Sequence, residues 1–186
     1  MQKDAVSLTT PLSDAVVKTL RAGTAVTISG VVYTARDAAH RRFMELLDRG
    51  EALPFDPAGS VIYYVGPTPA PPGRVIGSAG PTTARRMDPF VRRLSALGVK
   101  GSIGKGDRSP EVAEALMEHT AVYFAATGGV GALLSRHITG ARVIAFEDLG
   151  PEAVREFVFT DFPAVVAIDC RGNDIYAEGR KRYRVG

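Results

Sequence analysis

Three basic residues lie at predicted junctions between a strand and the following helix, namely Arg36, Arg86 and Lys105. The first turn of a helix carries free backbone N–H groups and a partial positive charge, so a cation there is mildly unfavourable. Cations at three such positions suggest that an anion comes from outside the chain. Because arginine binds a carboxylate through two parallel hydrogen bonds and lysine adds a compact charge, this pattern predicts recognition of a small molecule with two carboxylates.

Each of these stretches also has a simpler interpretation when it is taken alone. The Gly-Pro-Thr-Thr stretch at residues 80–83 is compatible with a turn and a helix cap, and Arg36 with Asp37 is compatible with a surface ion pair. The Gly-Lys-Gly stretch at residues 104–106 lacks the spacing of a phosphate-binding P-loop. A lone helical histidine such as His40 is more often a polar surface or capping residue than a catalytic one. Only the occurrence of three cationic junctions together favours anion binding.

The cysteine and histidine content limits the metal chemistry that this chain can perform by itself. Cys170 is the only cysteine among 186 residues, and the three histidines lie far apart without an H-x-x-x-H spacing. An internal disulfide, a zinc ribbon or an iron–sulfur cluster held by the chain's own thiolates would need more cysteines. We therefore expect no metal ligands in this chain, and any metal must be held mainly elsewhere.

Composition indicates an ordinary globular protein, because 45% of the residues are hydrophobic, 23% are charged and the formal net charge is only +3. These values predict one domain over residues 1–186 and disfavour a dedicated nucleic-acid binder, which usually carries a denser basic stripe. No stretch has the length of a membrane span and the N-terminus lacks a signal-peptide core. We expect a cytoplasmic protein, with residues 180–186 as a flexible basic tail.

Strand-like and helix-like segments alternate along most of the chain and must position the basic side chains. Strands are predicted at 6–10, 24–33, 61–65, 74–77, 99–103, 121–126, 141–146, 157–159 and 164–169, and helices at 13–20, 37–50, 87–98, 109–119 and 128–136. This alternation predicts an α/β domain with parallel pairing, and the strand-rich ends suggest a second sheet layer. Ligands of such folds gather at the carboxyl ends of the strands.

Several of these stretches, taken in order, resemble the β subunit or C-terminal region of class I iron–sulfur-dependent fumarate hydratases and the related L-tartrate dehydratases. The matching stretches are LTTPL at 8–12, ARDAAH at 35–40, GPTT at 80–83 with RMD at 86–88, IGKGDRS at 103–109, GG at 128–129, DFP at 161–163 and GND at 172–174. The resemblance covers nearly the whole chain. It implies a swivelling β/β/α domain, a single compact α/β unit with mixed sheets and flanking helices.

The resemblance also implies a division of labour between two polypeptides. A [4Fe–4S] cluster would be held by three cysteines of a partner α subunit, in a heterodimer or an α2β2 assembly. This chain would contribute Thr82 and Lys105 as catalytic residues, and it would bind a dicarboxylate through Arg36, Arg86, Lys105, Thr83 and His40. The implied reaction is the reversible hydration of fumarate to malate, with iron as the Lewis acid and Thr82 moving a proton.

Three alternatives remain open at this point. The substrate could be L-tartrate or mesaconate in place of fumarate, or the chain could be an anion-binding module without catalytic activity. Two residues depart from the family pattern, namely Ala35 at a position often held by glycine and Arg85 before the motif arginine. Neither change removes a candidate ligand, and Arg85 could add charge at the mouth of the site.

Overall fold

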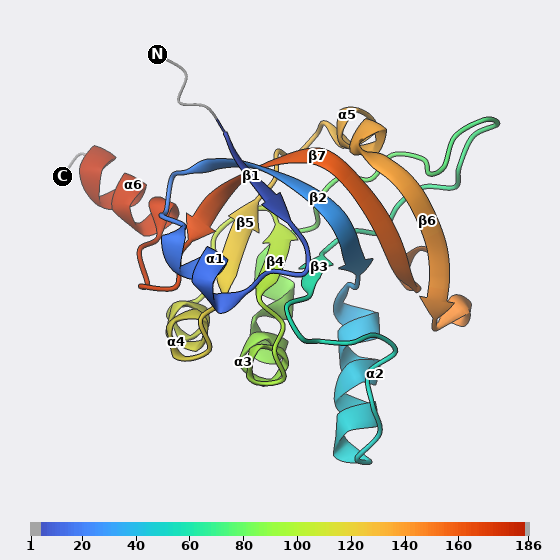
Figure 1. The fold of residues 1–186 in the computed structure, drawn as a ribbon, viewed down its shortest axis with the longest axis horizontal. Coiled ribbons are helices and arrows are strands. Elements are labelled where there is room, and N and C mark those ends of the chain that lie inside the picture. The colour runs from blue at the N-terminus through green and yellow to red at the C-terminus, as the bar shows by residue number, and fades with distance from the viewer. Residues whose placement is uncertain (1–4, 185–186) are drawn as a thin grey trace.

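A seven-stranded mixed sheet organises the chain in the computed structural model, which describes residues 5–184 (Figure 1). The strands are β1 (Val6–Thr9), β2 (Ala25–Thr34), β3 (Val61–Tyr63), β4 (Gly101–Gly104), β5 (Val122–Ala125), β6 (Ile138–Ala145) and β7 (Val154–Ile168). The α-helices are α1 (Asp14–Thr19), α2 (Asp37–Asp48), α3 (Asp88–Ala96), α4 (Pro110–Glu118), α5 (Gly131–Leu134) and α6 (Ile175–Tyr183). Short 3₁₀ helices are η1 (Ala84–Met87), η2 (Ser135–His137) and η3 (Glu147–Glu152).

The sheet closes on itself through its two longest strands. Its strand order is β1-β2-β3-β4-β5-β7-β6, and β2 also pairs with β7. Strands β1 to β5 run parallel to their neighbours, whereas β7 is antiparallel to β2, β5 and β6. The expected α/β architecture with mixed pairing is confirmed. The expected second β layer is not a separate sheet. The strands near the two ends of the chain belong to the same closed sheet and form its opposite wall.

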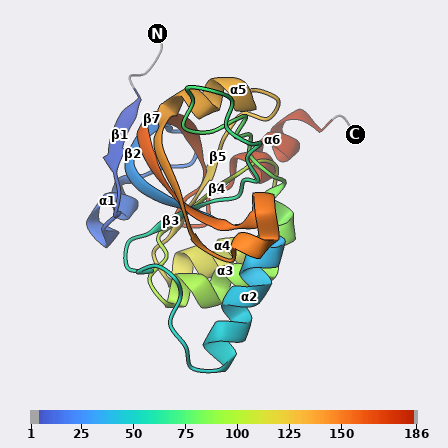
Figure 2. The ribbon, with the colours of Figure 1, turned by 90° about the vertical axis from the view of Figure 1, so that its right-hand side faces the viewer.

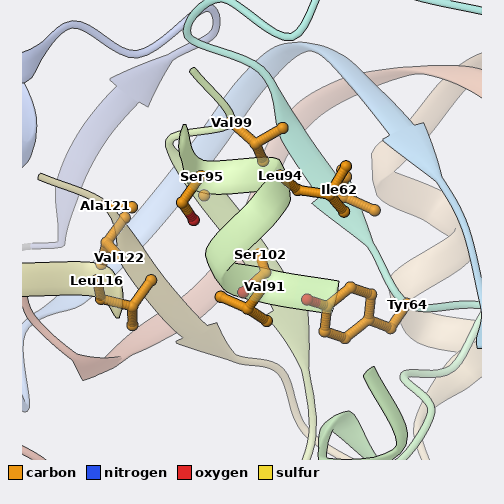
Figure 3. Close-up of a pocket in the computed structure, with 11 residues that line it drawn as sticks. Ile62, Tyr64, Val91, Leu94, Ser95, Val99, Ser102, Leu116, Ala121 and Val122 are labelled. Atoms are coloured by element: carbon orange, nitrogen blue, oxygen red, sulfur yellow. The ribbon is translucent and has the colours of Figure 1, made fainter. Parts of the chain in front are cut away.

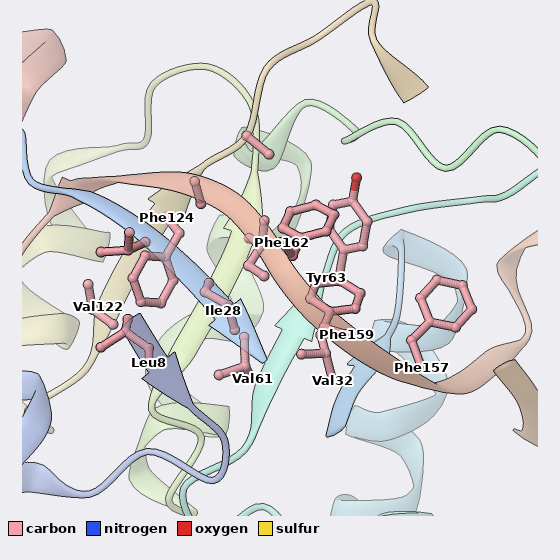
Figure 4. Packing of buried hydrophobic residues seen from close by; sticks show 14 of the residues in the cluster. Leu8, Ile28, Val32, Val61, Tyr63, Val122, Phe124, Phe157, Phe159 and Phe162 are labelled. Atoms are coloured by element: carbon pink, nitrogen blue, oxygen red, sulfur yellow. The ribbon is translucent and has the colours of Figure 1, made fainter. Parts of the chain in front are cut away.

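Alternation along β3 separates two hydrophobic cores. Val61 and Tyr63 point into the closed sheet, where the ring of Tyr63 packs edge-on against Phe162 with 5.3 Å between the centroids (Figure 4). Ile62 and Tyr64 belong to the second core, which α2, α3 and α4 cover from one side (Figures 1 and 2). Because successive residues of a strand face opposite sides, β3 is buried on both faces and holds the two layers together.

The expectation of two separate strands near the C-terminus is corrected by the long strand β7. The residues between the two predicted strands, 160–163, stay within the sheet as an irregularity of the pairing with β2. Asp161 has a φ of 48°, and its backbone N–H donates to the Ser29 hydroxyl at 2.9 Å. A left-handed residue supported by a side-chain acceptor therefore keeps β7 continuous between the two segments predicted as separate strands.

The segment predicted as a strand at 74–77 belongs to a long loop between β3 and η1. This loop is closed near its base by the N–H of Ser78, which donates to the Thr68 hydroxyl at 2.8 Å, and by the N–H of Gly77, which donates to the Thr68 carbonyl at 3.2 Å. The backbone groups at the loop base bond within the loop, so the segment adds no strand to the sheet.

The basic C-terminal stretch is helical as far as Tyr183, whereas the sequence had suggested a flexible tail from residue 180. Asp174 caps the start of α6 by accepting from the N–H of Tyr176 at 2.8 Å, and Arg180 contacts Asp107 at 2.8 Å. Residues 185–186 of the expected tail lie outside the described residues. Within residues 5–184, no helix combines the length and apolar character that crossing a bilayer demands.

Candidate functional site

The carboxyl ends of four neighbouring strands define one edge of the closed sheet. Strands β2, β3, β4 and β5 are parallel and adjacent, so the segments that follow them emerge side by side. Arg36 follows β2, Gly66 follows β3, Lys105 follows β4 and Gly128 follows β5. Loops at this edge of an α/β sheet are where ligands bind in such folds.

Thr82 and Lys105 are joined directly through the backbone. The N–H of Lys105 donates to the Thr82 carbonyl at 3.1 Å, and Thr83 pairs with Lys105 as a short parallel bridge. The N–H of Thr82 in turn donates to the Tyr64 carbonyl at 2.7 Å, which attaches this segment to the end of β3. Three predicted site residues, Thr82, Thr83 and Lys105, are therefore held together although they come from different loops.

The side chain of Lys105 runs across the glycine that follows β5. A Cβ atom added at Gly128 would stand 3.3 Å from the Lys105 Cδ, which is a tight contact. Lys105 is itself exposed, so its ammonium group is accessible at the edge. Glycine at position 128 thus leaves space for the lysine stem to lie along the loop.

Arg36 is the N-terminal flanking residue of α2, and its guanidinium is enclosed by two other segments. A Cβ atom added at Gly66 would stand 2.7 Å from one Nη atom of Arg36. The other Nη atom is 3.2 Å from the Glu152 carboxylate. The Nε of Arg36 is buried and has no acceptor within residues 5–184. A buried donor without a partner is costly and uncommon, so this chain leaves the guanidinium incompletely satisfied.

Arg86 is tied to the first turn of the same helix. One of its Nη atoms lies 2.7 Å from the Asp37 carboxylate, which directly follows Arg36. Burial acts to raise the pKa of Asp37, but its own backbone N–H, Arg86 and Arg36 together hold that pKa below the usual value. The carboxylate is therefore ionised at neutral pH and keeps Arg86 beside the start of α2.

His40 is placed differently from the other predicted site residues. Its ring is buried and stacks against Phe90 at 5.3 Å between centroids, with Tyr64 edge-on at 5.5 Å. The Nδ1 atom is 2.8 Å from the Arg36 carbonyl, and burial lowers the pKa of His40 to about 4. His40 is therefore neutral at pH 7. It supports the first turn of α2 from the hydrophobic core, and its ring does not reach the exposed edge.

Two charged residues near the edge were missed from the sequence, and they form a buried ion pair. The Nε of Arg108 donates to the Asp88 carboxylate at 2.6 Å, and the N–H of Ser109 donates to its other oxygen at 2.7 Å. The Arg108 guanidinium also lies over the Tyr123 ring at 4.8 Å. This pair joins the loop that carries Lys105 to the start of α3, which follows Arg86. Both residues lie within the family-matching stretches at 86–88 and 103–109, but no role in the site was predicted for them.

The enclosed pocket beneath α3 and α4 is a gap in the packing and not a ligand site. It is lined mainly by apolar side chains such as Ile62, Leu94 and Leu116 (Figure 3). Its volume of about 10 Å³ is at the lower limit for a single water molecule. The candidate site is therefore the loop edge and not this interior pocket.

The residues present do not fit the ligand set of an iron–sulfur cluster. Within residues 5–184 no three side chains of His, Cys, Asp or Glu are grouped as metal ligands. Cys170 follows β7 close to the pairing of Ile168 with Tyr123, at the opposite end of β5 from Gly128. Its thiol contacts the Val17 carbonyl at 3.8 Å. The one thiol is thus far from the loop edge.

Comparison with known proteins identifies the family of this chain. A family model described as the fumarase C-terminus matches residues 1–179. The chain belongs to this family. It is 41% identical over 160 residues to fumarate hydratase 2 of Leishmania major, a match that covers 84% of this chain and 28% of the relative. It is 38% identical over 159 residues to the aerobic class I fumarate hydratase of Escherichia coli K12, covering 83% and 29%.

A third relative has nearly the same extent as this chain. The putative L(+)-tartrate dehydratase subunit beta of Methanocaldococcus jannaschii is 38% identical over 172 residues, which covers 89% of this chain and 88% of the relative. By contrast, the chain spans less than a third of the length of the two fumarate hydratases. The resemblance inferred from the sequence motifs is confirmed.

Proposed function

We propose that this chain is the β subunit of a two-subunit hydro-lyase that reversibly adds water to fumarate to give malate. The observation that carries the proposal is the placement of Arg36, Arg86, Lys105 and Thr82 at one edge of the sheet. Their elements are joined by the hydrogen bond between Thr82 and Lys105 and by the ion pair between Arg86 and Asp37. The relatives named fumarate hydratase support this choice of substrate.

The basic side chains recognise the two carboxylates of the substrate. The guanidinium groups of Arg36 and Arg86 suit bidentate pairing with a carboxylate, and Lys105 adds a mobile ammonium. The buried Nε of Arg36 lacks an acceptor within the described residues, as expected of a guanidinium whose hydrogen bonds a further anion completes. Charge neutralisation by these groups also makes the C–H bond next to a carboxylate more acidic, because it stabilises the aci-carboxylate form.

In this proposal the hydroxyl of Thr82 transfers the proton to and from the substrate carbon next to one carboxylate. In the hydration direction a proton is added to the carbon next to one carboxylate while hydroxide is added to the other alkene carbon, so that water is consumed in full. In the reverse direction Thr82 accepts that proton. A neutral threonine is a weak base, and Lys105, whose backbone N–H donates to the Thr82 carbonyl at 3.1 Å, would bring a charged group on the adjacent loop to assist it. Thr83 would add a hydroxyl for substrate binding, whereas the buried His40 would act only indirectly, through its contact with the Arg36 carbonyl.

A [4Fe–4S] cluster belongs to the proposal as a group held by the partner α subunit. This chain does not have the thiolates to hold it, since Cys170 is its only cysteine. When bound by the partner, the cluster supplies a Lewis acid for the hydroxyl group of the substrate. The archaeal relative that is named subunit beta supports the two-subunit arrangement, either as a heterodimer or as an α2β2 assembly.

Anaerobic reconstitution tests this function. The chain is combined with a cluster-bearing α subunit, and hydration of fumarate, hydration of mesaconate and dehydration of L-tartrate are measured in parallel. We expect fumarate turnover by the complex, loss of turnover on exposure to oxygen, and neither turnover nor iron–sulfur absorbance for the chain alone. Preference for tartrate or mesaconate would move the assignment to those hydro-lyases. Fumarate turnover by the purified chain in a chelator would contradict the division between subunits.

A further inference from the structure

Glu152 is an acidic residue whose two oxygens both contact the region around Arg36. Its Oε1 is 3.2 Å from an Nη of Arg36, and its Oε2 accepts from the N–H of Ala38 at 3.1 Å. Ala38 lies in the first turn of α2, where free N–H groups and the helix dipole favour a carboxylate. Glu152 therefore binds the side chain of Arg36 and the start of the helix that carries it.

The segment that carries Glu152 is itself fixed in place. The guanidinium of Arg155 donates to the carbonyls of Gly150, Pro151 and Ala153 at 3.0, 3.2 and 3.1 Å. The N–H of Arg155 donates to the Thr34 hydroxyl at 2.9 Å, which attaches this segment to the end of β2. The backbone on either side of Glu152 is therefore fixed, and its carboxylate is held in addition by its own contacts with Arg36 and with the N–H of Ala38.

The far end of η3 is also anchored, on the side of α2. Asp148 pairs with Arg42, and Phe146 packs against Phe43 with 5.8 Å between ring centroids. In Figure 2 this turn lies beside the upper part of α2. Asp148 and Phe146 therefore attach the far end of η3 to α2, whereas residues 150–153 around Glu152 are held separately by the contacts of Arg155.

Gly66 encloses the other side of the same guanidinium. A Cβ there would lie 2.7 Å from an Nη of Arg36 and 3.5 Å from the Pro151 carbonyl. Arg36 therefore passes between the loop after β3 and the turn before β7. The glycine limits its movement on one side, and Glu152 holds it by charge on the other.

We propose that Glu152 is a positioning residue, which orients the Arg36 guanidinium for a substrate carboxylate. This inference rests on the proposed function of Arg36 in dicarboxylate binding. An alternative is that Glu152 competes with the substrate for Arg36 and must be displaced. The anchored backbone of residues 150–153 favours positioning. The two mechanisms predict opposite changes in KM when the carboxylate is removed.

The test uses Glu152→Gln and Glu152→Ala, with Asp148→Asn as the matched control. Asp148 lies on the same η3 segment, but its carboxylate pairs with Arg42 of α2 and not with Arg36. In the isolated chain, the ¹⁵N relaxation of the Arg36 Nε–H group is measured, with its resonance assigned by its disappearance in Arg36→Gln. In the complex with the α subunit, KM and kcat for fumarate are measured.

Positioning predicts restricted motion of the Arg36 Nε–H in the wild type and in Asp148→Asn, and increased motion in Glu152→Ala. It also predicts a KM raised by about tenfold for Glu152→Gln, and more for Glu152→Ala, with kcat changed less. In an Arg36→Gln background, Glu152→Gln should have no additional effect on KM. Melting temperatures close to that of Asp148→Asn would show that unfolding is not the cause.

Two results would overturn the inference. One is unchanged motion of the Arg36 Nε–H in both Glu152 variants, and the other is a lower KM in Glu152→Ala, which would show competition with substrate. If the wild-type complex hydrates none of the dicarboxylates, the proposed function fails, while the relaxation measurement still decides whether Glu152 holds Arg36.

Discussion

Asp37 and Arg86 connect two elements that carry the candidate arginines, through a contact of 2.7 Å between carboxylate and guanidinium. Asp37 directly follows Arg36 at the start of α2, whereas Arg86 lies in η1. One ion pair therefore places both arginines on neighbouring elements at the same edge of the sheet. The Asp37 carboxylate neutralises part of the positive charge of the two arginines. The Arg86 side chain remains half-exposed to solvent.

Replacing Lys105 with alanine should reduce activity far more than replacing a surface arginine. Losing one partner of a desolvated charged contact costs about 2 kcal/mol or more, which corresponds to a fall in kcat/KM of about 30-fold. Arg92→Ala and Arg93→Ala serve as controls, because these side chains pair with Glu118 and Asp48 on the helix surfaces. Equal losses in all three variants, measured on the reconstituted complex, would contradict the assignment of Lys105 to the site.

Adding a methyl group at Gly66 should disturb substrate binding with little change in folding. A Cβ there would collide with the flexible end of Arg36 at 2.7 Å, so the guanidinium must move. We expect Gly66→Ala to raise KM about tenfold, since small displacements of a binding group are costly. Gly179→Ala is the control, because a Cβ at that glycine meets nothing within 4 Å. A KM equal to that of Gly179→Ala would show that substrate binding does not depend on the Arg36 guanidinium lying beside Gly66.

The buried His40 should make the free energy of unfolding depend on pH. Its folded pKa of about 4 lies below the usual value of 6.5, so the unfolded chain binds the extra proton more readily. Stability from this residue is therefore fully present above pH 6.5 and is lost as pH falls toward 4, by up to roughly 3 kcal/mol. Chemical denaturation of wild type and His40→Gln across this range measures it. The difference between their pH slopes should vanish above pH 7, and identical slopes below pH 6 would refute the expectation.

Breaking the buried pair of Arg108 and Asp88 should destabilise the chain strongly. The Arg108 side chain is fully buried, so Asp88→Asn leaves its charge without a carboxylate, at a cost of about 3–5 kcal/mol. Glu118→Gln, which removes an exposed partner of Arg92, should leave the melting temperature almost unchanged. Because Asp88→Asn could prevent folding, the double variant Asp88→Leu with Arg108→Met provides a second measurement. It should recover part of the stability, and a double variant no more stable than Asp88→Asn would contradict the account.

Much of the fold and of the candidate site follows from local sequence patterns. Runs of β-branched and apolar residues predicted β2 to β5, and the 3.6-residue period predicted α2 and α3. The Ser-Pro-Glu start at residues 109–111 predicted α4 close to its observed bounds. The cations after β2 and β4 could be assigned to one edge because the carboxyl ends of adjacent parallel strands must meet. Family membership was also accessible, since the order of the motifs is a property of the sequence alone and the family model confirms it.

Tertiary structure decided the features that depend on residues distant in sequence. Glu152 comes from the turn before β7, and nothing local indicates that closure of the sheet brings it to Arg36. The burial of His40 likewise depends on α3 supplying Phe90, so a position that could have been a surface histidine became a neutral core residue. Local patterns specify which segment becomes a helix or strand, whereas contact between distant charges arises only when the sheet closes. Which charged side chains meet at the edge is therefore a consequence of the packing.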